Sequence, residues 1–146
     1  MKLLFICVEN SCRSQMAEGF ARSVMVSPGT KSGRRIPQIE VYSAGSMPSG
    51  IVNPIAVAVM KEKGINISAQ TSKGFNALPE GEFDITITMG CGDECPSIPA
   101  KKRINWQIRD PKGSPIEVFR EVRDEIEKKV LELLNQYTEV RIHNSE

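Results

Sequence analysis

The chain has 146 residues, 40% of them hydrophobic, and a formal net charge of +1. This length and apolar content suit one compact domain with a buried core. The small net charge excludes the broad basic surface of a nucleic-acid-binding protein, and no apolar run approaches the ~18 residues that a membrane span needs. The first expected strand starts almost at Met1, with no leader before it, so we expect a cytoplasmic protein without nucleic-acid or membrane partners.

The first apolar stretch runs into a loop that starts at a cysteine and ends at an arginine. Leu3–Ile6 predicts a buried strand, and the apolar spacing of residues 14–26 predicts an amphipathic helix. Cys7 therefore stands where the strand ends and Arg13 where the helix begins, with five residues between them. A loop of this length against a helix N-terminus can aim backbone N–H groups inward, and with the forked guanidinium they favour a tetrahedral oxyanion.

The same positive field favours the thiolate form of Cys7, and the Ser14 hydroxyl can donate a hydrogen bond to its sulfur. A cysteine at a strand end is often only a small hydrophobe, and an arginine in a first helical turn is often only solvated. The order strand, Cys, loop, Arg, Ser, helix favours the functional interpretation, because an anion cradle requires this order. We expect the oxyanion to be bound by Val8, Glu9, Asn10, Ser11, Cys12, Arg13 and Ser14.

A second cysteine pair follows another expected strand. Residues 83–89 alternate apolar with polar and end at Gly90, after which Cys91 and Cys95 are separated by three residues. In an open parallel sheet, ligands bind at the carboxyl ends of the strands, so we expect Cys91 to face the same crevice as Cys7. In a reducing compartment, the four cysteines indicate catalytic, redox or metal-binding roles rather than structural disulfides.

The remaining segments complete an α/β pattern. We expect a surface loop at 27–37, strands at 39–43 and 103–108, a helix capped by Asn53, and a long helix after Ser114. This order predicts a single-domain, open, doubly wound sheet of about four parallel strands flanked by helices. We expect the catalytic domain to cover residues 1–138, with a polar C-terminal tail at 139–146.

Two stretches carry a family resemblance. Residues 7–19 resemble the signature of the low-molecular-weight protein tyrosine phosphatases and of the arsenate reductases that share their fold, and the likeness extends from about Lys2 to Gln136. Gln15 favours the resemblance to the reductases, because the phosphatases usually carry Pro at this position. Asp110-Pro111 resembles the general-acid motif of the superfamily, and the Lys112-Gly113 that follows is closer to the reductases.

The resemblance implies an enzyme that reduces arsenate to arsenite. Cys7 would attack arsenate, Arg13 would neutralise the oxyanion, and Asp110 would assist the departing oxygen. Cys91 would then attack Cys7 to release arsenite, and Cys95 would carry the disulfide outward to thioredoxin. We therefore expect no bound cofactor, and thioredoxin as the external reductant.

Two other functions remain open from the sequence. A phosphatase would use Cys7, Arg13 and Asp110 on phosphotyrosine or small phosphate esters, with Cys91 and Cys95 only protective. A structural zinc site would use the four thiolates, although Arg13 beside them is unfavourable. Some of these reductases associate a potassium ion with an Asp where this chain has Asn66, so we expect no metal.

Overall fold

The computed structural model describes residues 1–25, 39–90 and 98–144. The expected loop at 27–37 and the cysteine pair Cys91 and Cys95 lie outside the described residues. The secondary structure elements are, in chain order, β1 (Lys2–Cys7), α1 (Arg13–Met25), β2 (Glu40–Gly45), α2 (Pro54–Lys61), the 3₁₀ helix η2 (Phe75–Ala77), β3 (Phe83–Thr88), β4 (Ala100–Asn105) and α3 (Ile116–Asn144).

The sheet has four parallel strands in the order β2-β1-β3-β4, which confirms the predicted α/β class. β1 lies between β2 and β3, and its residues from Leu3 to Cys7 are buried. Consecutive strands β1 and β2 pair directly, whereas β3 returns to the other side of β1. The chain therefore changes winding direction beside β1, and the carboxyl end of this strand is the position where open α/β sheets bind ligands.

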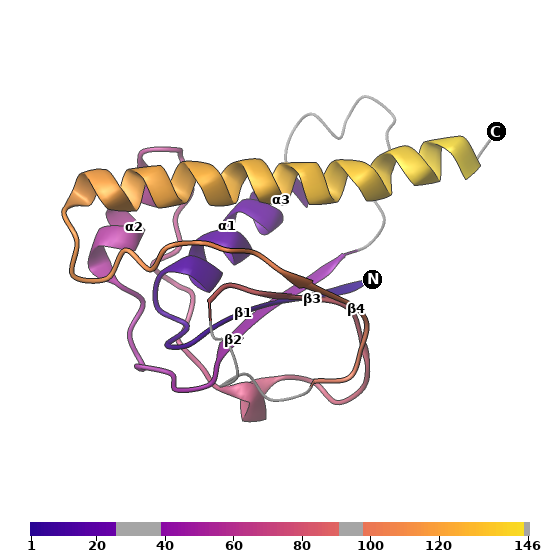
Figure 1. Cartoon of the computed structure of the whole chain (residues 1–146), viewed down its shortest axis with the longest axis horizontal. Helices are drawn as coiled ribbons and strands as arrows, with labels where there is room; N and C mark the ends of the chain where they lie inside the picture. Colours follow the sequence, from indigo (N-terminus) through magenta and orange to yellow (C-terminus); the bar gives the residue numbers. More distant parts are fainter. Residues whose placement is uncertain (26–38, 91–97, 145–146) are drawn as a thin grey trace.

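Helices α1 and α3 cover one face of the sheet, with α2 packed under the start of α3, and η2 lies on the opposite side (Figure 1). Phe5, Met16 and Phe119 are fully buried in the core between the sheet and these helices. A smaller cluster on the other face contains Leu4, Ile6, Ala44 and Phe83. Because β1 contributes buried side chains to both clusters, its carboxyl end is held rigidly in place.

The fourth strand differs from the prediction. We expected it at residues 103–108, but β4 covers Ala100–Asn105 and contains the polar run 101–103. β4 pairs with β3 alone and lies at the sheet edge, where exposed lysines are favoured and the apolar alternation of a buried strand is absent. Trp106 and Ile108 lie after the end of β4, and both are buried in the core cluster.

The start of α2 confirms the predicted cap. Asn53 Oδ1 accepts hydrogen bonds from the backbone N–H groups of Ile55 at 2.8 Å and Ala56 at 3.4 Å. Gly64 follows the helix with φ 77°, a conformation that suits glycine. α3 extends through residues 139–144, so the backbone of that part of the expected tail is helical.

None of the helices in the described ranges combines the length and the apolar character that a membrane crossing requires.

Candidate active site

The loop between β1 and α1 has its carbonyl groups tied outward. The carbonyls of Val8, Glu9 and Ser11 accept hydrogen bonds from the backbone N–H groups of Met47, Ser49 and Asn53, respectively. In a trans peptide the C=O and the N–H point in opposite directions. The N–H groups that follow these carbonyls therefore point to the other side of the loop, and we infer that this side forms the anion cradle.

Asn10 and Gly45 give the loop its shape. Asn10 has φ 51°, and it is the only non-glycine residue with positive φ in the described part of the chain. Its carbonyl and its side-chain oxygen both accept from Gln15 Nε2, at 3.0 and 2.8 Å. A Cβ at Gly45 would lie 2.5 Å from the carbonyl oxygen of Val8, so only glycine lets β2 approach the loop this closely.

A chain of hydrogen bonds leads from a buried carboxylate to the expected nucleophile. Ser43 Oγ donates to Glu18 Oε1 and accepts from Asn10 Nδ2 at 3.0 Å. The same Asn10 nitrogen donates to Ser14 Oγ at 2.8 Å, and Ser14 Oγ lies 2.8 Å from Cys7 Sγ. Glu18 accepts the Ser43 proton, and the backbone N–H of Lys73 donates to Asn10 Oδ1, so that Asn10 Nδ2 faces the two hydroxyls. Ser14 Oγ accepts from Asn10, and its own proton can be donated to the sulfur.

Two cations balance the charge of Glu18. Arg22 Nε donates to Glu18 Oε2 at 2.8 Å, and Lys73 Nζ lies 3.8 Å from Oε1 and 3.4 Å from Ser43 Oγ. Burial lowers the pKa of Lys73, while the charge of Glu18 acts in the opposite direction. Glu18 thus has two cationic partners in this structure.

Arg13 is 6% exposed and is anchored by the segment that follows β4. Its Nη1 atom donates to the carbonyl oxygen of Ile108 at 3.1 Å, and its Nη2 atom lies 3.6 Å from Asp110 Oδ2. A Cβ at Gly90, which has φ 84°, would overlap the Nη1 atom. The missing side chain of Gly90 therefore leaves the space that the guanidinium occupies.

These elements enclose a cavity of about 10 Å³. It is lined by Cys7, Glu9, Ser11, Cys12, Arg13, Asp110 and Lys112. Cys7 is 2% exposed, whereas the Asp110 side chain is 48% exposed and can exchange protons with water. Burial, together with the charges of Asp110 and Cys7, raises the pKa of the Cys12 thiol to about 12, so Cys12 stays protonated at neutral pH. The arrangement offers one nucleophilic thiol, one guanidinium and one carboxyl group to a bound oxyanion.

The structure brings Cys7, Arg13 and Asp110 together around one cavity, as the sequence predicts. Sequence reasoning missed the contributions of Ile108, Gly90, Lys112 and Lys73, which reach the site from distant parts of the chain. It also missed the ion pair of Lys73 with Glu18, which lies on α1 itself. Because Cys91 and Cys95 lie outside the described residues, the disulfide relay and the zinc alternative stay predictions.

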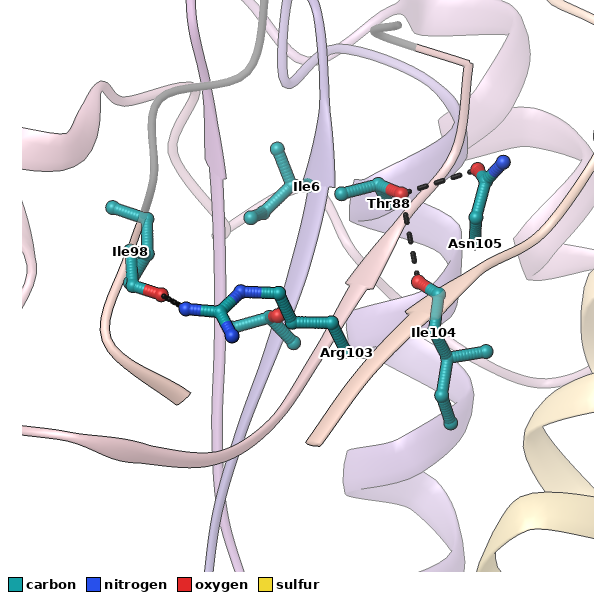
Figure 2. A pocket seen from close by; sticks show the side chains of 7 residues that line it. Ile6, Thr88, Ile98, Arg103, Ile104 and Asn105 are labelled. Atoms are coloured by element: carbon teal, nitrogen blue, oxygen red, sulfur yellow. Dashed lines mark hydrogen bonds between the residues drawn. The ribbon is translucent and has the colours of Figure 1, made fainter. Parts of the chain in front are cut away.

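A larger cavity of about 190 Å³ lies against β1, β3 and β4 (Figure 2). Its lining residues are Ile6, Thr86, Thr88, Ile98, Arg103, Ile104 and Asn105. Arg103 Nη2 donates to the carbonyl of Ile98 at 2.8 Å, and Thr88 Oγ1 donates to Asn105 Oδ1 at 3.1 Å. No cysteine, histidine or carboxylate is among these described lining residues.

Residues 2–143 match the family model described as "Low molecular weight phosphotyrosine protein phosphatase". The chain belongs to this family. The match covers the cradle, the Asp110 loop and nearly all of α3, so the resemblance seen in the signature extends through the whole fold.

Within this family, the chain is similar to proteins and solved structures that are named arsenate reductases. A protein from Synechocystis sp. (strain ATCC 27184 / PCC 6803 / Kazusa) named "Glutaredoxin arsenate reductase" is 39% identical over 136 residues, which cover 91% of this chain and 95% of that protein. A solved "arsenate reductase in the phosphate binding state" superposes with a TM-score of 0.74 at 38% identity, over 92% of this chain and 97% of that one. A "thioredoxin-dependent arsenate reductase" from Corynebacterium glutamicum is 31% identical with a TM-score of 0.68, over 96% of this chain and 62% of that one.

Proposed function

We propose that this protein is an arsenate reductase that uses Cys7 as its nucleophile. The observation that carries the proposal is that Cys7, Arg13 and Asp110 line one cavity in a chain whose relatives are named arsenate reductases at 39% identity. The thiol, the guanidinium and the carboxyl group match the three requirements of oxyanion chemistry, which are attack, charge neutralisation and protonation of the leaving oxygen.

In the first step, the Cys7 thiolate attacks the arsenic atom of arsenate. A sulfur–arsenic bond forms and an arsenic–oxygen bond breaks, and the leaving oxygen departs as water after taking a proton from Asp110. The loop amides and Arg13 stabilise the charge on the remaining oxygens, and the Ser14 hydroxyl stabilises the attacking sulfur.

In the second step, the Cys91 thiolate attacks the Cys7 sulfur, and a Cys7–Cys91 disulfide forms. The electron pair of the sulfur–arsenic bond passes to arsenic, which leaves as arsenite, so arsenic gains the two electrons that the thiols lose. Cys95 then attacks Cys91, which frees Cys7 as a thiolate and leaves a Cys91–Cys95 disulfide. The sequence supports this order, because Cys91 directly follows Gly90 and the Gly90 backbone lies against Arg13.

A dithiol reductant must then reduce the Cys91–Cys95 disulfide. We propose thioredoxin for this role, because one structural neighbour is described as thioredoxin-dependent. The name of the Synechocystis relative makes glutaredoxin the alternative that the assay has to include. The relay also requires a compartment that keeps thiols reduced, and for this reason we propose a cytoplasmic location.

A phosphatase is the second candidate function, and the family match favours it. The same thiolate would attack the phosphorus of an ester, the alcohol oxygen would leave with a proton from Asp110, and water would then hydrolyse the phospho-cysteine. Hydrolysis needs one thiol, whereas reduction needs three, so the cysteine variants separate the two functions.

The test compares arsenate turnover, coupled to thioredoxin or to glutaredoxin, with hydrolysis of p-nitrophenyl phosphate. Cys7→Ser should abolish both activities. Cys91→Ser should stop arsenate turnover and leave any hydrolysis largely intact. Cys95→Ser should permit about one turnover and then trap a Cys7–Cys91 disulfide, because no thiol remains to carry the oxidation outward.

Peptide mapping under non-reducing conditions identifies the trapped bridge. The wild-type protein treated with arsenate should instead contain a Cys91–Cys95 disulfide. If Cys91→Ser and Cys95→Ser both keep the wild-type arsenate turnover, the relay is wrong and the phosphatase becomes the better account of the site.

A further inference from the structure

An ion pair crosses the mouth of the anion cradle. Lys112 Nζ donates to both carboxylate oxygens of Glu9, each at 2.8 Å, across a sequence separation of 103 residues. Glu9 belongs to the loop after β1, and Lys112 belongs to the loop that carries Asp110. Both side chains line the cavity that contains Cys7. The pair therefore connects the two loops between which a substrate has to pass.

The space behind this ion pair is too small for a substrate. The cavity of about 10 Å³ corresponds to roughly one water molecule, whereas a tetrahedral oxyanion carries four oxygens. An anion can enter only when a lining group moves. Arg13 is fixed by the Ile108 carbonyl, but the Glu9 and Lys112 side chains are 30% and 55% exposed and can separate.

We propose that the Glu9–Lys112 ion pair is a bar across the cradle that selects small inorganic oxyanions over aryl phosphate esters. An exposed ion pair opens at little cost, so a small anion can enter and the pair can form again above it. The aryl group of an ester would project between the two loops and keep the pair broken. This inference deepens the proposed function and rests on it only for the identity of the oxyanion.

The pair also controls the charge at the mouth. The Glu9 carboxylate alone would repel an entering anion, and the Lys112 ammonium neutralises it. The hydrogen bonds to Glu9 raise the pKa of Lys112, so the ammonium stays charged at neutral pH. Glu9→Gln and Lys112→Gln should therefore open the mouth alike and change the affinity for anions in opposite directions.

Access is measured by the alkylation of Cys7 in the full chain, followed by peptide mass spectrometry. The two probes are N-methylmaleimide and the bulkier N-phenylmaleimide. In both variants we expect the ratio of the phenyl rate to the methyl rate at Cys7 to rise roughly two- to five-fold, the range that the loss of one exposed ion pair allows. Lys101→Gln, which removes an exposed ion pair with Asp84, is the matched control and should leave the ratio unchanged.

Affinity is measured by the concentration of inorganic phosphate that halves the alkylation rate of Cys7. This concentration should fall in Glu9→Gln, rise in Lys112→Gln and return close to the wild-type value in the double variant. The proposal is overturned if the access ratio moves in neither variant, if it moves equally in Lys101→Gln, or if both single variants change the affinity in the same direction.

The consequence for specificity is a ratio of kcat/KM values. Hydrolysis of p-nitrophenyl phosphate relative to arsenate turnover should rise in both single variants, and an unchanged ratio would overturn the proposed selection. Neither alkylation readout uses arsenate. A protein that gives both alkylation results but does not reduce arsenate would refute the proposed function and leave the bar in place.

Discussion

Ser14 Oγ lies 2.8 Å from Cys7 Sγ, and a buried hydrogen-bond network positions the Ser14 hydroxyl for this contact. Asn10 Nδ2 donates to Ser14 Oγ and to Ser43 Oγ, while Ser43 donates to the buried Glu18 carboxylate. Ser14 Oγ accepts from Asn10, so its own proton can be donated to the Cys7 sulfur. The network therefore offers a hydroxyl donor to the expected nucleophile.

Ser14→Ala should lower kcat by about 10- to 100-fold, because a hydrogen bond to a charged group contributes roughly 1.5–3 kcal/mol. The alkylation of Cys7 at pH 7 should also be slower than in the wild type, because the sulfur loses a hydrogen-bond donor. Ser23→Ala is the control, since the Ser23 hydroxyl on the same helix donates to the Phe20 carbonyl and does not line the cavity. An unchanged alkylation rate of Cys7 in Ser14→Ala would show that Ser14 does not activate the sulfur.

Cys7 and Cys12 should differ sharply in reactivity. With its pKa raised to about 12, Cys12 has almost no thiolate at neutral pH, and the thiolate is the reactive form. Iodoacetamide should therefore label Cys7 at least roughly ten times faster than Cys12 at pH 7. Phosphate, sulfate or arsenate should protect Cys7, and chloride at equal ionic strength should protect it poorly, as peptide mass spectrometry can measure. Equal protection by chloride would reduce the effect to charge screening.

The sequence was sufficient for the parts of the site that are local in the chain. Cys7, Arg13 and Ser14 lie on one strand–loop–helix unit, and their order alone predicts their arrangement. The carbonyl of Ile108 holds Arg13 across a separation of 95 residues, and no local pattern marks a backbone carbonyl as an anchor.

The same limit applies to Lys112 and to the fourth strand. In the sequence, Lys112 is a charged residue in a loop, and only the fold places it beside Glu9, 103 residues away. β4 begins three residues before the predicted start of the fourth strand, because pairing with β3 at the sheet edge decides its position, whereas its own sequence contains the polar run 101–103. A hydrophobic pattern indicates which face of a helix or strand is buried. It gives no information about an ion pair between two polar loops or about the position of a polar edge strand.

Glu62 should give the fold a defined acid sensitivity. Hydrogen bonds from Arg120 and Arg123 lower the pKa of Glu62 to about 2. A carboxyl group with a depressed pKa in the folded state stabilises the protein above its unfolded pKa of about 4.3, and this stabilisation is lost as the pH falls from there toward about 2. The contacts join the end of α2 to α3.

Glu62→Gln should therefore unfold at a lower urea concentration than the wild type at pH 7, and the two proteins should converge as the pH approaches 2. Urea midpoints measured at several pH values give the comparison. Glu80→Gln, which changes an exposed carboxylate in the turn before β3, is the control and should follow the wild type. A constant difference between Glu62→Gln and the wild type at every pH would mean that the charge of Glu62 is not what stabilises this contact.

Gly90→Ala should weaken the anion site by displacing Arg13. Gly90 has φ 84°, so alanine there costs about 1–2 kcal/mol of backbone strain, and its Cβ would overlap Arg13 Nη1. Gly64→Ala is a matched control, because Gly64 has φ 77° but no heavy atom within 4 Å of an added Cβ.

Both variants should lose similar stability in urea unfolding, whereas only Gly90→Ala should need more phosphate, roughly ten-fold or more, to protect Cys7 from alkylation. Phosphate protection is the appropriate readout, since Gly90 also precedes Cys91 and a change in arsenate turnover could arise from the relay. Equal phosphate protection in the two variants would show that the guanidinium can move away from the new methyl group without losing the anion, and the role assigned to Gly90 would then be wrong.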